Sequence, residues 1–290
     1  MKVSGFTIIR NAVKFDFPIV EAVKSILPVC DEVVVAVGNS EDDTLGLIKS
    51  IDSDKVKIIE TVWDDTLREG GKVLAVETNK AFDAISPDSD WGFYIQADEC
   101  VHEKYLPAIK EAMLKWKDNP EVEGLLFNYL HFYGSYDYVG NSRKWYGNEI
   151  RIVRNDKQIR SFRDAQGFRK NNRLLRVKPI NAWMYHYGWV KDPRTQQEKR
   201  KEFEKMWHDD EFVEKKIAVS DEFDYSSIDS LAKFEGTHPK VMQERIKRQN
   251  WTFTYDPTKG IKLPPAKQFL NFLEKITGRE IGRYKNYKKI

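Results

Sequence analysis

An aspartate follows directly on an apolar run, at a position typical of a ligand for a hard divalent cation. The run WGFYIQA predicts a strand over Trp91–Ala97 that leads straight into Asp98 and Glu99. A carboxylate placed there can coordinate Mg²⁺ or Mn²⁺, and such an ion neutralises the charge that builds on a leaving phosphate. Neighbouring strand residues point to opposite faces, so only one of the two acids is expected to face a site. Capping of the following helix explains the same pair of acids equally well.

Polar residues also follow the first two predicted strands. In open α/β sheets, ligands bind beyond the carboxyl ends of the strands, so these residues are expected at the edge where a nucleotide would lie. They are Arg10 and Asn11 after the first strand, and the segment that begins with Gly38 and Asn39 after the second, which ends at Val37. The next residues, Ser40–Thr44, serve equally well as a helix cap or as ligand contacts.

Alternating strand and helix patterns predict the sheet that positions these residues. The expected strands are Val3–Ile9, Glu32–Val37, Lys55–Ile59, Trp91–Ala97 and Gly124–Leu130, and the expected helices are Phe17–Leu27, Lys72–Ile85 and Lys104–Trp116. The β-branched run EVVVAV has no polar alternation, which predicts a strand buried on both faces. The alternation of strands with helices predicts an α/β fold, with a mostly parallel sheet and helices on both of its faces.

The character of the chain changes twice. After His131 it becomes rich in Tyr, Gly and Asn, which predicts loops and an antiparallel hairpin, and from about Pro193 it becomes charged and helical. We therefore expect an α/β domain over residues 1–190 and a helical C-terminal extension over residues 191–290. A final amphipathic helix has its apolar residues at spacings of three and four, namely Phe269, Phe272, Leu273 and Ile276.

Composition excludes several classes of protein. Hydrophobic residues make up 41% of the 290, enough for a sizeable core, so disorder is excluded. The 48 basic and 45 acidic residues give a net charge of +3, too balanced for a nucleic-acid-binding chain, and no nucleic-acid partner is expected. The two cysteines, Cys30 and Cys100, are too few for a disulfide framework. No run of 18 apolar residues, which would indicate a transmembrane helix, is present. A cytoplasmic location is therefore expected.

Several of these blocks, taken in order, resemble family-2 glycosyltransferases over about residues 4–190. They are Arg10-Asn11, CDEVVVAVGNSEDDT at Cys30–Thr44, DWGFYIQADE at Asp90–Glu99, WYGNEIRIVRN at Trp145–Asn155, RDAQG, and YHYGW at Tyr185–Trp189. The last three are similar to bacterial members that act on surface-glycan acceptors, and FEGTHPKVM and RYKNYKK also fit a bacterial subgroup. The resemblance implies a GT-A fold and a nucleotide-sugar donor, which is a UDP-, GDP-, CDP- or dTDP-sugar. It also implies Mn²⁺ or Mg²⁺ as cofactor and, for most members, inversion of the anomeric centre.

The resemblance also implies roles for individual residues. The family's Asp-x-Asp motif maps to Gln96, Ala97 and Asp98, so Asp98 is the implied metal ligand, while the Gln96 amide adds no negative charge for the ion. His186 is implied to complete the metal or diphosphate site, a role that imidazole can fill beside a carboxylate. The alternative for His186 is a histidine packed among aromatic side chains. Val37 stands where family members carry an acid that faces the nucleoside base, so the identity of the base stays open.

An inverting transfer also needs a base beside the acceptor hydroxyl. The resemblance favours Asp164, with Glu149 in reserve, and an ion pair of Asp164 with Arg160 or Arg163 is the alternative. Lys72, beside two glycines, is a candidate contact for the diphosphate, although a solvated lysine at a helix start is the preferred interpretation. The aromatic residues of Phe132–Tyr138 and Trp145-Tyr146 are candidates for stacking on sugar faces or for core packing.

The sequence thus predicts a glycosyltransferase that moves a sugar from a nucleotide diphosphate to a glycan, a lipid-linked or another acceptor. Two alternatives stay open. A nucleotidyltransferase also uses strand-end carboxylates and a divalent ion, but Phe6–Val13 lacks the expected glycine-rich phosphate loop. A non-catalytic module with a GT-A fold, binding a nucleotide or sugar, is supported by Gln96 and Val37, where acids are missing.

The C-terminal end carries a concentrated positive charge. Among the last twelve residues, Glu280 is the one acid against Arg279, Arg283, Lys285, Lys288 and Lys289, a net charge of +4 that leaves −1 for the rest of the chain. Such a tail beside an amphipathic helix suits peripheral contact with an anionic membrane surface, the inner face for a cytoplasmic protein, if the acceptor is lipid-linked. The preferred alternative is a helix docked on the α/β domain with its apolar stripe buried.

Overall fold

The computed structural model describes residues 1–217, 219–258, 264–277 and 282–290. Its strands are β1 Val3–Ile9, β2 Glu32–Gly38, β3 Val56–Thr61, β4 Trp91–Tyr94, β5 Glu99–Val101, β6 Gly124–Tyr133, β7 Ser135–Gly140, β8 Asn148–Arg154, β9 Ile159–Phe162, β10 Gly167–Lys170, β11 Arg173–Trp189, β12 Leu231–Lys233 and β13 Tyr287–Lys289. Its α-helices are α1 Ile19–Ile26, α2 Thr44–Lys49, α3 Lys72–Asp83, α4 Leu106–Trp116, α5 Pro193–Glu204, α6 Asp210–Phe212, α7 Gln243–Lys247 and α8 Pro265–Thr277.

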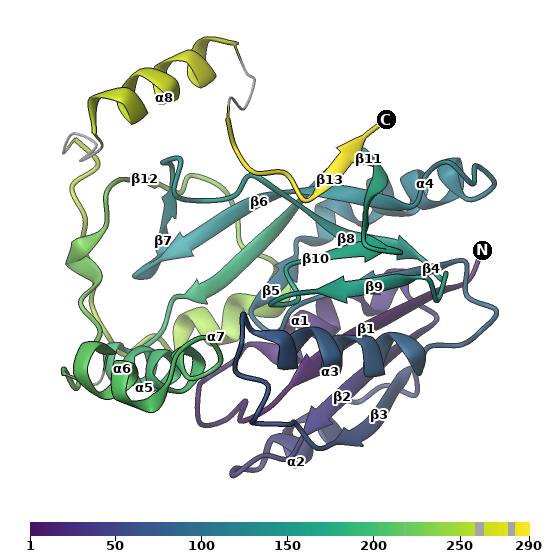
Figure 1. The fold of residues 1–290 in the computed structure, drawn as a ribbon, viewed down its shortest axis with the longest axis horizontal. Coiled ribbons are helices and arrows are strands. Elements are labelled where there is room, and N and C mark those ends of the chain that lie inside the picture. Colours follow the sequence, from purple (N-terminus) through teal and green to yellow (C-terminus); the bar gives the residue numbers. More distant parts are fainter. Residues whose placement is uncertain (218, 259–263, 278–281) are drawn as a thin grey trace.

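The strands form one mixed sheet in the order β3-β2-β1-β4-β8-β6-β11-β10-β9 (Figure 1). Strands β3, β2, β1 and β4 pair in parallel, as do β6 and β11. Strand β8 runs antiparallel to both of its neighbours, β4 and β6. The predicted fold class, an α/β fold built on a mostly parallel sheet, is confirmed.

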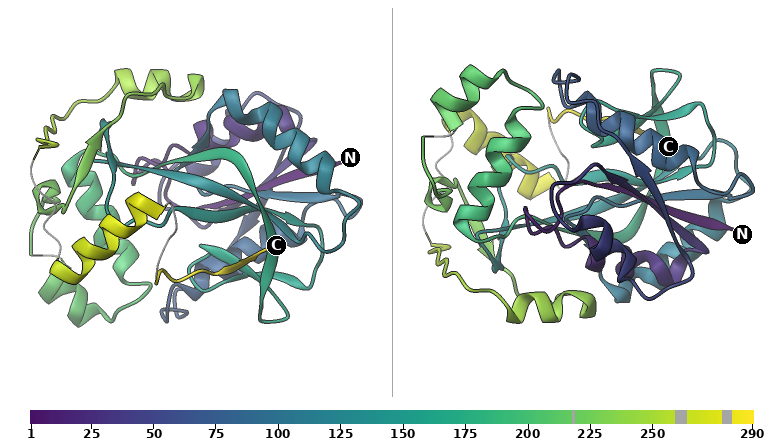
Figure 2. Two further views of the ribbon diagram at one scale, coloured as in Figure 1. Left: turned by 90° about the horizontal axis from the view of Figure 1, so that it is seen from above. Right: turned by 90° about the horizontal axis from the view of Figure 1, so that it is seen from below.

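Both faces of the sheet are covered, which explains the unbroken apolar run of β2. Val33 and Val35 lie in the core cluster that α1, α2 and α4 complete, whereas Val34 and Ala36 lie in the cluster that α3 completes. Figure 2 shows these helices on the two sides of the sheet. A strand whose side chains alternate between two cores needs apolar residues at every position.

Two predicted elements differ in extent from those of the structure. The strand predicted over Trp91–Ala97 ends at Tyr94, because the chain turns at residues 97–98 and starts the separate strand β5 at Glu99. The predicted hairpin is present as β6 and β7, which pair antiparallel. The extension after residue 190 is less helical than predicted, since β12 pairs with β7 and β13 pairs in parallel with β11.

Helix α8 contradicts the prediction of a buried apolar stripe. Phe269, Phe272 and Ile276 are 61%, 57% and 67% exposed. On the other side of the helix, the Glu274 carboxylate pairs with Arg143 and with Arg283, and its side chain is only 10% exposed. A polar contact therefore holds α8, which lies outside the layered body beyond β7 and β12 (Figure 1).

The charged tail is only partly described. Arg279 and Glu280 lie outside the described residues. Within the described part of the chain, no helix combines the length and the apolar character that crossing a bilayer requires.

A buried ion pair joins the end of the sheet to the turns around it. Arg151 donates from Nε and Nη2 to the two Glu99 oxygens, at 2.8 and 2.7 Å, and neither side chain has exposed surface. The Tyr129 hydroxyl donates to the same carboxylate at 2.7 Å, and the Gln96 backbone N–H does so at 3.1 Å. Arg151 also donates to the Gln166 carbonyl at 2.9 Å. One network thus holds both the turn before β5 and the turn between β9 and β10.

We predict that Arg151→Met destabilises the protein by about 3–5 kcal/mol, because it leaves the Glu99 carboxylate buried without its partner. Urea denaturation followed by circular dichroism measures this loss. The control is Lys247→Met, which removes a surface ion pair with Glu244, and no measurable loss is expected from it. Equal stability of Arg151→Met and the wild type would contradict the structural role of the pair.

Candidate functional site

A cavity of about 590 Å³ opens beyond the carboxyl ends of β1 and β4. Its size lies within the range of small-molecule binding sites. Most of the wall comes from the strand ends of the sheet, the turn between β9 and β10, and the helix α5 with the turn that follows it. Phe17 before α1 and Leu74 of α3 complete it. The cavity therefore lies where the topology of an open α/β sheet predicts a ligand site.

Half of the residues predicted from the sequence line this cavity. They are Arg10, Gln96, Ala97, Asp98, Asp164 and His186. They come from four separate segments, namely the end of β1, the turn after β4, the turn between β9 and β10, and β11, and they include the implied metal ligands and the favoured base. Asp98 faces the cavity whereas Glu99 points into the core, as expected for neighbouring residues of which only one can face the site.

Asp98 is held between an imidazole and an ammonium group. Its Oδ1 lies 3.7 Å from His186 Nε2, and its Oδ2 accepts a hydrogen bond of 3.1 Å from Lys199 Nζ. Burial by itself would raise the pKa of Asp98, but Lys199, His186 and Lys191 outweigh it and hold the pKa below its ordinary value. A Cβ atom at Gly188 would lie 2.7 Å from His186 Nε2 and 2.8 Å from Asp98 Oδ2, so this close approach requires glycine. Asp98 is therefore a carboxylate in a confined space.

A chain of hydrogen bonds decides which nitrogen of His186 carries the proton. His131 Nε2 lies 2.8 Å from the Tyr146 carbonyl, which only accepts, so this nitrogen is the donor. Burial and the neighbouring His186 lower the pKa of His131 to about 3, so its Nδ1 carries a lone pair. His186 Nδ1 lies 3.1 Å from that lone pair and donates to it. Burial also lowers the pKa of His186, and its Nε2 is consequently unprotonated where it faces Asp98.

This pair fits a divalent ion as two ligands. The lone pairs of Asp98 Oδ1 and His186 Nε2 face each other at 3.7 Å and repel unless a cation lies between them. Two metal–ligand bonds of about 2 Å each are long enough to bridge this separation. A carboxylate oxygen and a neutral imidazole both suit Mn²⁺ and Mg²⁺ sites with further oxygen ligands. Across the described ranges, no group of three or more His, Cys, Asp or Glu side chains gathers as a metal site. The remaining ligands would have to come from a bound phosphate and water.

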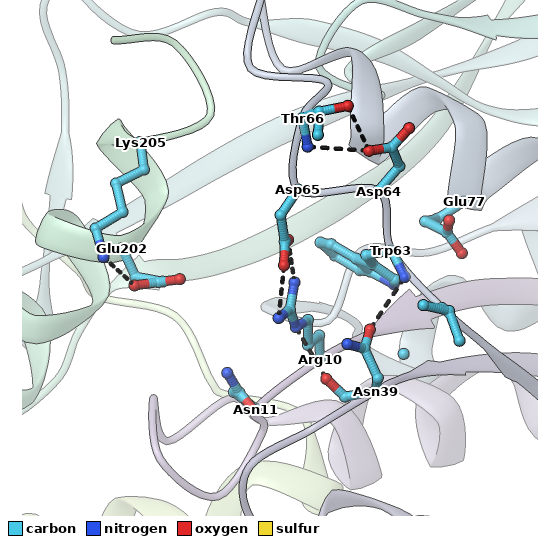
Figure 3. A network of polar contacts seen from close by, with 12 residues as sticks. Arg10, Asn11, Asn39, Trp63, Asp64, Asp65, Thr66, Glu77, Glu202 and Lys205 are labelled. Atoms are coloured by element: carbon cyan, nitrogen blue, oxygen red, sulfur yellow. Dashed lines mark hydrogen bonds and ion pairs between the residues drawn. The ribbon is translucent and has the colours of Figure 1, made fainter. Parts of the chain in front are cut away.

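Arg10 lies at the rim of the cavity, where the protein itself holds its guanidinium group. It donates to the Asp65 carboxylate at 2.5 and 3.2 Å and to the Asn39 carbonyl at 3.0 Å (Figure 3). The Asn39 side chain accepts from the Trp63 backbone N–H at 3.0 Å, so its amide braces the loop after β3. Arg10 is thus positioned at the rim, while Asn39 supports it from outside the cavity.

The other polar residues after β1 and β2 brace the two loops against each other. Asn11 is in the left-handed region, with φ 54°, and its Oδ1 accepts from the Glu41 backbone N–H at 2.8 Å. Val37 is buried in the core, and the Trp63 indole packs so closely on Gly38 that a Cβ atom there would clash. Asn11, Val37 and Gly38 lie outside the cavity wall. The helix-cap alternative for the next residues is confirmed, since Asp43 caps α2 through the Gly46 N–H.

Asp164 reaches the cavity from the tip of the hairpin formed by β9 and β10. Its neighbours Arg163 and Ala165 both have left-handed backbone, with φ 57° and 59°, conformations that cost free energy for residues other than glycine. Gln96 Nε2 donates to the Ala165 carbonyl at 3.3 Å, so this amide supports the turn. Arg160 pairs with Asp83 rather than with Asp164. The hairpin therefore presents a carboxylate to the cavity.

Lys72 and Glu149 lie elsewhere. The Lys72 ammonium pairs with Glu69 at 2.7 Å and is largely exposed, which confirms the interpretation as a solvated lysine at the start of α3. Glu149 lines a separate cavity of about 170 Å³ and accepts a hydrogen bond of 2.9 Å from Asn286 Nδ2. Burial raises the pKa of Glu149 to about 7. Glu149, the reserve base, therefore borders a different cavity from Asp164, the favoured base.

One wall of the cavity was not expected from the sequence. It is formed by α5 and the turn after it, through residues spaced along one helix face, namely Gln196, Lys199, Arg200, Phe203, Glu204 and Trp207. Their three- and four-residue spacing, with basic and aromatic types on one stripe, is the signal that would have identified this face. Of the two alternatives for the aromatic residues of Phe132–Tyr138, core packing holds for Phe132 and Tyr136, which are buried in the core. Trp63, Trp189 and Trp207 line the cavity instead.

Comparison with known proteins finds likeness in structure only. No family model and no curated protein matches the chain. Among solved structures, TarS of S. aureus is similar at 16% identity and a TM-score of 0.39, over 70% of this chain and 39% of TarS. The chain thus spans well under half the length of TarS.

Two further solved structures are similar at lower TM-scores. The 4-diphosphocytidyl-2C-methyl-D-erythritol synthase of Anaerococcus prevotii matches at 10% identity and a TM-score of 0.34, over 53% of this chain and 70% of that one. Glucosyl-3-phosphoglycerate synthase of Mycobacterium tuberculosis was solved in complex with Mn²⁺, UDP and phosphoglyceric acid. It matches at 15% identity and a TM-score of 0.31, over 45% of this chain and 43% of that one. At these identities the likeness concerns the fold, so the function has to be inferred from the residues of the site.

We predict that Glu149→Gln stabilises the protein at pH 8. In the folded protein the pKa of Glu149 is about 7, above its ordinary value of 4.5. The protonated carboxyl therefore contributes fully to the free energy of unfolding below pH 4.5, and this contribution is lost as the pH rises to 7. The variant avoids this loss and should be more stable by about 1–3 kcal/mol at pH 8, with the difference vanishing near pH 4.5. Urea titrations at both pH values measure it, with exposed Glu111→Gln as control. A difference independent of pH would contradict the burial of a titrating carboxyl.

Proposed function

We propose that this protein transfers a sugar from a nucleotide diphosphate donor to a hydroxyl group of an acceptor. The observation that carries the proposal is the meeting, in one cavity at the strand ends, of the Asp98 carboxylate and the unprotonated Nε2 of His186. Cationic groups of Arg10, Lys199 and Arg200 line the same cavity, and its tryptophans offer flat apolar surface. Anionic phosphates and a sugar face are the ligand parts that these groups complement.

In this proposal Asp98 and His186 would hold Mn²⁺ or Mg²⁺ at the donor site. When bound, the ion supplies Lewis-acid assistance, because it neutralises charge on the departing nucleoside diphosphate. The neutral His186 is suited to this role, since imidazole binds a metal through an unprotonated nitrogen. Lys199 keeps the carboxylate ionised, and Gly188 leaves the space for its close approach to the imidazole.

Asp164 takes the proton in the proposed transfer. The acceptor oxygen forms a bond to the anomeric carbon while the bond from that carbon to the phosphate oxygen breaks, and its electron pair stays on the nucleoside diphosphate. The proton of the acceptor hydroxyl goes to the Asp164 carboxylate, which lines the cavity on a different segment from Asp98. Attack from the face opposite the leaving group inverts the anomeric configuration. The acceptor we propose is a glycan or a lipid-linked hydroxyl compound.

We predict that Asp98→Asn lowers donor turnover by about 100-fold or more, because the amide keeps the shape of the side chain but removes the charge that binds the ion. A thermal-shift screen of UDP, GDP, CDP and dTDP with Mn²⁺ first identifies the nucleoside. Release of that nucleoside diphosphate from the matching sugar donors is then measured, with melting temperature as the check on folding. Unchanged turnover in Asp98→Asn would remove the metal assignment.

The same assay separates this function from its two rivals. Consumption of a nucleoside triphosphate with release of pyrophosphate indicates a nucleotidyltransferase. Binding of a nucleoside diphosphate with no turnover of any sugar donor, in the presence of glycan and lipid-linked acceptors, indicates a binding module.

We also propose that α8 and the basic C-terminus contact an anionic membrane surface. The outward apolar residues Phe269, Phe272 and Ile276 support this proposal, since such a stripe inserts at the boundary of headgroups and acyl chains. Residues 265–290 carry seven basic and two acidic side chains, a net charge of +5, whereas the rest of the chain carries −2. Basic segments next to an apolar stripe are attracted to anionic lipids by about 1 kcal/mol per cation.

We predict that the double variant Phe269→Glu, Phe272→Glu loses binding to vesicles rich in phosphatidylglycerol, because it places two acids on the inserting stripe. Vesicle flotation measures the bound fraction, and vesicles of pure phosphatidylcholine test the charge requirement. Val62→Glu is the control, since it adds an acid at another exposed apolar residue. Unaltered flotation of the double variant, or no flotation of the wild type, would refute membrane contact through α8.

A further inference from the structure

The ammonium group of Lys199 enters the cavity from the C-terminal extension. Its Nζ donates to Asp98 Oδ2 at 3.1 Å and to the Gly188 carbonyl at 3.2 Å, and its side chain is only 11% exposed. The rings of Phe17 and Phe203 lie 4.7 and 5.4 Å from the same nitrogen. Since an ammonium group has three N–H bonds, these two acceptors leave one N–H for a ligand in the cavity that Lys199 lines.

Other cations of the cavity are paired with carboxylates that have no contact with Asp98. Arg10 pairs with Asp65, and Arg200 lies 3.8 Å from Glu204. Lys199 instead shares its carboxylate with His186, so the cation of Lys199 and the proposed metal position lie on the two oxygens of one side chain. Any phosphate that approaches an ion on Oδ1 therefore comes within the reach of a fixed positive charge on Oδ2.

Charge balance indicates what this second cation is for. A sugar nucleotide carries two negative charges on its diphosphate, which one divalent ion neutralises. Breaking the sugar–phosphate bond leaves a third negative charge on the nucleoside diphosphate. A second cation that is already in place stabilises this charge without further rearrangement.

We propose that Lys199 donates its remaining N–H to a diphosphate oxygen of the donor, so that α5 completes the donor site. This inference rests on the proposed function, because it names a residue that would hold the same diphosphate. A lysine with a solely structural role would orient Asp98 and touch no phosphate. The two roles differ without metal: orienting Asp98 for an ion then contributes nothing to nucleotide affinity, whereas a direct contact with the diphosphate still does.

We predict that Lys199→Met weakens binding of the nucleoside diphosphate about tenfold or more in EDTA, and leaves binding of the matching nucleoside unchanged. The nucleoside diphosphate is the one of UDP, GDP, CDP and dTDP that stabilises the wild type most. Isothermal titration calorimetry of both ligands, with EDTA and then with Mn²⁺, measures the effect. Lys199→Arg keeps the charge, so it should retain most of the affinity.

The matched control is Lys205→Met, which removes one positive charge from an exposed lysine just after α5 that pairs with Glu202. It should leave both affinities unchanged. Equal diphosphate affinity of Lys199→Met and the wild type in EDTA would overturn the inference and leave the proposed function standing. Absence of binding of all four nucleoside diphosphates by the wild type would overturn the proposed function itself. If Lys199→Met does not fold, Lys199→Gln gives the same comparison with a polar side chain.

Discussion

The candidate site depends on the buried ion pair between Glu99 and Arg151. Glu99 and Arg151 are both fully buried, and burying two charges is costly unless their remaining hydrogen-bonding atoms are satisfied. Here they are satisfied by the groups that shape the cavity, since the carboxylate accepts from the Gln96 N–H and the guanidinium donates to the Gln166 carbonyl. The pair therefore fixes two turns at once. One turn carries Asp98 and the other carries Asp164, so the separation of the two cavity carboxylates follows from a contact behind them.

The second shaping contact is the line of hydrogen bonds from Tyr146 through His131 to His186. It uses a backbone carbonyl, which can only accept, to set the protonation of two buried imidazoles in turn. The result is an unprotonated nitrogen that faces a carboxylate, an arrangement that repels in the absence of a cation. Gly188 makes the approach possible, because any side chain there would fill the space between the two groups. The strand end YHYGW thus has a physical reason for its histidine and for its glycine.

The part of the chain after residue 190 contributes to the same cavity that the sheet begins. Helix α5 adds Lys199 beside Asp98, and Phe203 packs against Phe17 with ring centroids 5.9 Å apart. Farther along, β13 pairs with β11 and brings Asn286 to the buried Glu149. Helix α8 differs, since a polar contact holds it and its apolar stripe faces outward. The extension therefore makes two kinds of surface, one closed around the cavity and one exposed.

The sequence by itself determined the α/β architecture and placed Arg10 after the first strand and Asp98 after the fourth, because strand and helix periods are local properties of neighbouring residues. His186 was singled out by the family resemblance and by no local period. The sequence also offered a helix cap as one of two alternatives for Ser40–Thr44 and predicted the solvated Lys72, and both contacts depend on residues only three positions away. Only the tertiary structure decided that Lys199 contacts Asp98, that Asn39 and Gln96 brace loops, and that Glu149 borders another cavity. The partners in these contacts are separated by 24 to 137 residues. Contacts over such separations follow from how the elements pack, and a pattern among neighbouring residues does not predict them.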